Sequence, residues 1–198
     1  MISQWKGKAL LALMMTGFLF SESASSIGAD RRIDTERSTL KIHVGKAGLF
    51  SVAGHDHWVT ARFAEGSFND SDFPRVSFAV DARGLALMED DKLSPGEQAE
   101  VQHTMHVQVL ESETYPLISF HSVKIQKAGA DHWIVFGDLT LHGRTKPIQA
   151  DVRIGDGAYT GHAKIKQTDF GINPVSVAGG VVKVKNELEI YFVVVPLQ

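Results

Sequence analysis

The sequence predicts an all-β protein, namely an eight-stranded antiparallel barrel with one helical insertion between the third and fourth strands. Three observations lead to this prediction. Apolar and polar residues alternate with a period of two along eight segments, short turn-forming stretches separate these segments, and one segment has the start signals of a helix. Eight antiparallel strands avoid exposed edges by closing, and they enclose room for side chains or one small ligand.

The first expected strand, residues 38–45, places Leu40 and Ile42 on one face and Lys41 and His43 on the other. Such alternation is typical of a strand with one buried face. The same alternation recurs in residues 58–68, 75–83, 117–126, 132–141, 147–154, 158–167 and 183–195. Turn-forming residues lie between these segments, as in Gly155-Asp156-Gly157, so the connections are short enough for hairpins.

The helical segment follows the third expected strand. Ser94, Pro95 and Glu97 supply an N-cap, a proline at the first helical position and the glutamate of a capping box. The expected helix ends between His106 and Glu111, and it lies across the sheet or closes one barrel mouth. Apolar residues recur along it at every fourth position: Val101, Met105 and Val109.

Composition excludes several classes of function. The 198 residues include 20 Lys and Arg against 23 Asp and Glu, so no basic surplus is available to neutralise the phosphates of a nucleic acid. The chain has no cysteine, which excludes disulfides, zinc–thiolate and iron–sulfur sites and a thiol nucleophile. No nucleophile elbow or phosphate-binding glycine loop occurs. The hydrophobic fraction of 43% fits one globular domain.

The N-terminal segment, residues 1–28, is typical of a secretory signal peptide. Lys6 and Lys8 precede the uncharged apolar run 9–20, which is shorter than the roughly 20 residues that span a bilayer, and small residues follow. We therefore expect a mature domain of residues 29–198 in the periplasm, with no transmembrane segment. An uncleaved membrane anchor is the alternative.

Four ordered motifs resemble those of YceI-like proteins. Residues 137–148, GDLTLHGRTKPI, are similar to the LTLHGVTKPV signature of that family, with Arg144 in place of valine. Residues 115–122 resemble its YPxIxFxS motif, residues 168–172 its DFGI motif and residues 186–190 its closing strand. The resemblance implies a periplasmic, lipocalin-like barrel that binds a long apolar chain, a polyisoprenoid or fatty-acid-like lipid. It also implies a non-enzymatic binding or carrier protein with no required cofactor.

The strand alternation independently predicts a set of inward-facing apolar side chains. These residues could line a cavity for a hydrocarbon chain, or they could pack on one another and leave no void. The sequence leaves open whether the barrel forms a homodimer. The expected inward set is Leu40, Ile42, Phe63, Phe78, Val80, Ile118, Phe120, Val135, Leu139, Leu141, Val152, Ile165, Leu188, Ile190, Phe192 and Val194.

Two histidine pairs suggest a second function. His55 and His57 would share one face of a strand, and His103 and His106 would share one face of the expected helix. Four imidazoles could bind zinc, copper or haem, which makes a metal- or haem-binding module the alternative function. The other interpretation is a hydrogen-bonded network at the barrel mouth. Both pairs lie where the chain departs from the usual family pattern, in residues 50–58 and 101–106.

Overall fold

A computed structural model describes residues 29–47, 56–71, 74–177 and 182–198 of the chain. The expected signal peptide and His55 lie outside the described residues. None of the helices in the described ranges is long and apolar enough to cross a bilayer.

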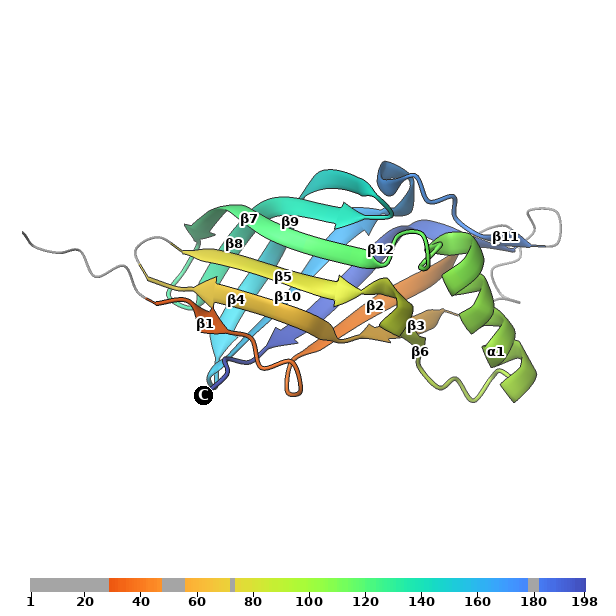
Figure 1. The fold of residues 1–198 in the computed structure, drawn as a ribbon, viewed down its shortest axis with the longest axis horizontal. Coiled ribbons are helices and arrows are strands. Elements are labelled where there is room, and N and C mark those ends of the chain that lie inside the picture. Colours follow the sequence, from red (N-terminus) through yellow and green to blue (C-terminus); the bar gives the residue numbers. More distant parts are fainter. Residues whose placement is uncertain (1–28, 48–55, 72–73, 178–181) are drawn as a thin grey trace, which may run out of the picture.

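The described chain forms one strongly curled, all-antiparallel sheet with one helix (Figure 1). The order of its neighbouring strands is β1-β4-β5-β7-β8-β9-β10-β12-β2-β3-β6, and β11 pairs separately with β12. The strands are β1 (Arg31–Arg32), β2 (Thr39–Ala47), β3 (His57–Ala61), β4 (Phe63–Asn69), β5 (Arg75–Asp81), β6 (Ala86–Leu87), β7 (Leu117–Lys127), β8 (His132–Leu141), β9 (Arg144–Gly155), β10 (Ala158–Lys166), β11 (Ser176–Val177) and β12 (Val182–Val194). The all-β class and the helical insertion are confirmed.

The strand count differs from the expected eight because one expected strand is two. Residues 58–68 divide at Arg62 into β3, which pairs with β2, and β4, which pairs with β5. These strands lie near opposite ends of the sheet order, so one short stretch of chain brings both ends of the curled sheet together. Val59, Ala61 and Phe63 are all buried, so the inward alternation continues through the division. The short strands β1, β6 and β11 add to the count.

Two-residue turns join β8 to β9 and β9 to β10. His142 and Gly143 have φ values of 50° and 68°, and Asp156 and Gly157 have φ values of 50° and 74°. Positive φ at both central residues defines the type I′ turn, whose twist matches that of paired strands. Because this turn needs only two residues, β9 begins at Arg144, earlier than the expected residue 147.

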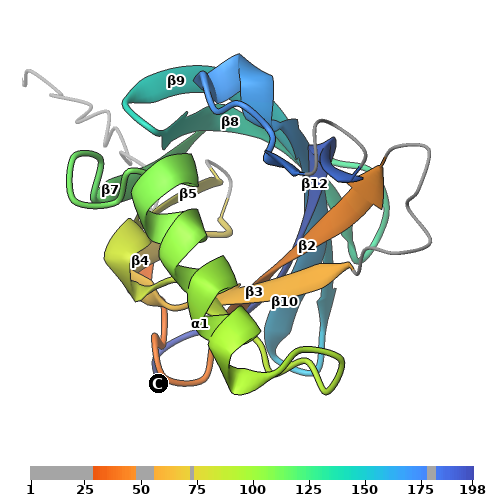
Figure 2. The same ribbon diagram turned by 90° about the vertical axis from the view of Figure 1, so that its right-hand side faces the viewer.

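The helix α1 (Pro95–Thr104) begins as expected. Ser94 Oγ accepts a hydrogen bond from the Glu97 backbone N–H, and Glu97 Oε2 accepts one from the Ser94 N–H at 2.8 Å. A π-helical turn, Met105–Val109, continues α1, so the helical segment ends within the expected range. Figure 2 shows α1 lying across one end of the ring of strands.

Candidate ligand-binding cavity

The barrel interior contains a cavity of about 640 Å³ rather than a filled core. The sheet places alternate side chains of its long strands inside, where they form apolar walls. All sixteen residues of the expected inward set lie along this cavity, from Leu40 and Ile42 on β2 to Phe192 and Val194 on β12. These are the positions that the period-two alternation places on the inner face.

The cavity has further apolar walls that the sequence did not assign to it. They include Val44 and Val59 beside the first expected residues, Trp133 and Tyr159 near the other end, and the helical face Val101, Met105 and Val109. The four-residue spacing of that face predicted an apolar side of the helix. It could not show that this side covers a cavity rather than a packed core.

Glycines next to aromatic rings shape the wall. A Cβ at Gly161 would collide with the Phe192 ring, and a Cβ at Gly137 would collide with the Phe120 ring. Each ring therefore lies over the glycine of the neighbouring strand. Phe120 also stacks on Phe78 at a centroid distance of 5.3 Å. Large side chains are thereby held against the wall, which keeps the middle of the barrel open.

At one end of the cavity, Asp70 and Tyr159 form a hydrogen-bonded cluster with Arg31. Arg31 Nη2 donates to Asp70 Oδ2 at 2.7 Å and to Tyr159 Oη at 2.8 Å, and the Tyr159 hydroxyl donates to Asp70 at 2.5 Å. Burial, reinforced by the nearby Asp70 carboxylate, raises the pKa of Tyr159 to about 12. The tyrosine therefore stays neutral and keeps donating to Asp70 across the physiological pH range.

The other end lies beneath α1 and is more highly charged. Lys46 and Lys183 from β2 and β12 lie along it, as do Glu97 and Glu100 from α1. His57 from β3 also lines this end, with its Nδ1 3.9 Å from Asp90 Oδ2. The cavity thus joins a charged mouth under the helix to an apolar middle.

The expected histidine cluster is not assembled by the described residues. His57 lies at the cavity mouth and His103 is exposed on α1. His106 has both ring nitrogens engaged, one with Gln102 at 2.6 Å and the other with Ser112 at 3.1 Å. Within the described ranges, no group of three or more His, Asp or Glu side chains is arranged to hold a metal ion. For His106, the hydrogen-bonded network is the correct interpretation.

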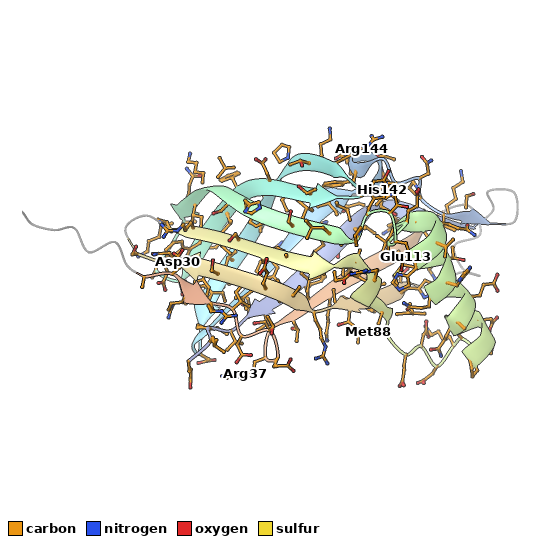
Figure 3. All side chains as sticks on the ribbon, viewed as in Figure 1. Asp30, Arg37, Met88, Glu113, His142 and Arg144 are labelled. Atoms are coloured by element: carbon orange, nitrogen blue, oxygen red, sulfur yellow. The ribbon has the colours of Figure 1, made fainter. Side chains whose placement is uncertain are left out.

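Three of the sequence motifs meet at one corner of the barrel. Tyr115 packs on His142 with a centroid distance of 4.3 Å, and its ring also fills the space that a Cβ of Gly143 would need. The Arg144 guanidinium lies against Gly171, which has a φ of 77°. Figure 3 shows His142 and Arg144 toward the helix end and Asp30 at the opposite end. These motif residues stabilise the corner where β8, β9 and the chain after β10 converge.

The fold and cavity define the class of protein: an antiparallel, barrel-like protein with an apolar internal cavity and a helix over its mouth. A family model described as the YceI-like domain matches residues 32–195, so this chain belongs to the YceI-like family.

Individual relatives agree over most of the chain. It is 27% identical to the Protein YceI of Escherichia coli O157:H7 over 180 residues, which cover 83% of this chain and 87% of the relative. It is 26% identical over 186 residues to a UPF0312 protein of Yersinia pestis, covering 83% and 86%. Among solved structures, BcnA of Burkholderia cenocepacia matches with a TM-score of 0.57 and 16% identity, covering 82% of this chain and 98% of that one. This last similarity shows a shared fold.

Proposed function

We propose that this protein is a non-enzymatic binding or carrier protein that sequesters a long-chain apolar lipid, a polyisoprenoid or fatty-acid-like molecule, inside the barrel. The observation that carries the proposal is the cavity of about 640 Å³ with walls of aliphatic and aromatic side chains. Cavities with apolar walls and few polar groups are typical of small-molecule sites. Membership of the YceI-like family supports the same function.

The size of the cavity sets the expected ligand length. At about 30 Å³ for a water-sized group, it has room for roughly twenty methylene groups. Burial at about 0.8 kcal/mol per methylene would then contribute about 16 kcal/mol, which exceeds most estimates of the association cost of about 4–15 kcal/mol. Apolar burial alone is therefore sufficient for binding, and longer chains would protrude from the mouth.

The two ends of the cavity favour one ligand orientation. The Arg31–Asp70–Tyr159 cluster at the far end consists of groups that already satisfy one another. The mouth beneath α1 carries Lys46 and Glu97, which suit a hydrated polar headgroup. We therefore propose that the apolar tail points toward Tyr159 and the headgroup stays beneath the helix.

Native mass spectrometry of protein purified under gentle conditions tests the proposal, followed by titration of delipidated protein with a series of fatty alcohols. We expect a co-purifying long-chain lipid. We also expect affinity to increase with chain length and to level off near roughly twenty carbons, because further methylenes find no wall to contact. No bound apolar molecule and no affinity for any chain would contradict the proposal.

We further propose that the mature protein acts in the periplasm after removal of residues 1–28. The positively charged start and short apolar run support this location. Cell fractionation and sequencing of the mature N-terminus test it, and we expect a new N-terminus close to residue 29. An intact N-terminus on a protein embedded in the membrane would instead support the anchor.

A further inference from the structure

The helix α1 is attached to the barrel in an unusual way. None of the residues of α1 or of the π-helical turn after it is buried. Val101 and Met105 instead face the cavity. Met105 and Val109 are partly buried and pack against the core, so apolar contact supplies part of the attachment. Specific hydrogen bonds supply a further part.

Gln102 makes two such hydrogen bonds to the edge of the sheet. Its Oε1 accepts from the Leu87 backbone N–H at 2.6 Å, and its Nε2 donates to the Leu85 carbonyl oxygen at 2.8 Å. Leu87 belongs to β6, the last strand in the sheet order, and Leu85 directly precedes β6. The side-chain amide thus binds the strand edge much as another strand would. We call this pair of bonds the latch.

The latch determines how His106 is protonated. A backbone N–H can only donate and a carbonyl oxygen can only accept, so the Gln102 amide has one possible orientation. Its Nε2 then points a second N–H at His106 Nε2, 2.6 Å away. His106 Nε2 must accept, which leaves the proton on Nδ1, where it is donated to Ser112 Oγ at 3.1 Å. The arrangement therefore requires neutral His106.

We propose that Gln102 and His106 are positioning residues that hold α1 over the cavity mouth, and that protonation of His106 releases the helix. A charged imidazole carries a hydrogen on each ring nitrogen, so its Nε2–H would face the Gln102 N–H. The Gln102 amide could instead rotate so that its Oε1 accepts from the His106 Nε2–H. The rotation would place Oε1 against the Leu85 carbonyl oxygen and Nε2–H against the Leu87 backbone N–H. Either outcome breaks the latch. The inference rests on the proposed function, because it describes regulation of the same cavity.

Other titratable groups act differently at this mouth. His106 has no ion pair with any described residue, and Gln102 and Ser112 are the partners of its ring. His57 lies 3.9 Å from Asp90, in the segment that leads into α1, and protonation of His57 would strengthen that contact. Glu97, Glu100 and the exposed His103 lie on the helix itself. Glu111, next to Ser112 in the chain, lies 3.3 Å from His142 Nε2 and forms a second carboxylate–histidine pair at this end. Acid release through His106 must overcome both pairs.

The release rate of a conjugated-polyene fatty alcohol, a fluorescent ligand without a titratable group, tests the latch between about pH 7.5 and about pH 5. We expect roughly 25-fold faster release at the acidic end, corresponding to two lost hydrogen bonds of about fivefold each. His106→Gln offers Gln102 an acceptor without titrating, so its release rate should not increase at the acidic end. Gln102→Ala should release quickly at both values.

Gln98→Ala is the matched control. Gln98 lies one turn earlier on α1 and donates to the Asp90 and Leu93 carbonyl oxygens, outside the latch. Its release should follow the wild-type pH dependence. Acid release that persists in His106→Gln, or an unchanged rate in Gln102→Ala, would overturn the proposal.

Hydrogen exchange of residues 95–109 in the ligand-free protein provides a readout that needs no lipid. After correction for the intrinsic pH dependence, exchange should be faster at the acidic end in the wild type but not in His106→Gln. This result separates the two proposals: a protein that binds no lipid would contradict the carrier function, whereas pH-independent helix exchange would contradict the latch.

Discussion

Filling the middle of the cavity should shorten the chain that the protein accepts. Ala163 on β10 is 5% exposed, lines the cavity and lies opposite Ala150 on β9 and Ile190 on β12. Ala163→Leu would add three carbons at this position of the cavity wall. At about 0.8 kcal/mol per methylene, a ligand that loses burial of roughly three methylenes loses about 2.4 kcal/mol, or about 50-fold in Kd.

Displacement of the fluorescent fatty alcohol by a series of chain lengths measures this effect. We expect affinity to level off roughly three carbons earlier than in the wild type, with the free energy of unfolding unchanged or increased because the new side chain fills a void. Ala64→Leu is the matched control, since Ala64 on β4 is exposed and does not line the cavity. A folded Ala163→Leu protein with wild-type affinity and chain-length limit would refute lipid binding in the middle of the barrel.

Three further predictions concern the wall, the far end and the helix. Gly161→Ala should lower the free energy of unfolding by roughly 1–3 kcal/mol, because its methyl group collides with Phe192; an unchanged guanidinium midpoint would contradict that close approach. Tyr159→Phe should cost about 1 kcal/mol below pH 10. Since the pKa of Tyr159 rises on folding from 10.0 to about 12, this wild-type advantage should disappear as the pH increases through that interval; urea denaturation that shows a constant difference would argue against it. Ser94→Ala removes the capping box with Glu97 and should cost about 1 kcal/mol of helix stability, seen as faster hydrogen exchange in α1 and refuted by equal rates.

The cavity wall was predictable because side-chain direction in a strand depends on local alternation. Leu139 and Leu141 on β8, or Ile190 and Phe192 on β12, face the same way wherever their strand pairs. This dependence on local alternation also explains why the division at Arg62 was not predictable. Inward alternation continues through it, while the change from pairing with β2 to pairing with β5 involves backbone hydrogen bonds that leave no mark on the side-chain pattern.

The histidines show a different limit of the sequence. Their spacing predicted shared faces, but a shared face does not identify a partner. From the sequence, the partner of His106 could be a metal, solvent or a side chain. Only the position of β6 beside α1 shows that the partner is Gln102, which forms a hydrogen bond with His106 Nε2. The far end was missed because Arg31, Asp70 and Tyr159 come from widely separated segments that contain no recognisable motif.

Ligand binding and helix attachment must be coupled in this architecture. Val101 and Met105 gain full apolar contact only when a chain fills the cavity, so a bound lipid stabilises the closed helix as well as the barrel. A ligand that binds only the folded protein contributes about 2.7 kcal/mol of stability at a concentration 100 times its Kd. That contribution is comparable to the two hydrogen bonds of Gln102, each worth about 1 kcal/mol. Opening the mouth of a loaded barrel therefore requires loss of the latch and of the contacts with the lipid, whereas opening an empty barrel requires loss of the latch and of the contacts that Met105 and Val109 make with the core. Acid, by breaking the latch, should therefore weaken the closed state of both the loaded and the empty barrel.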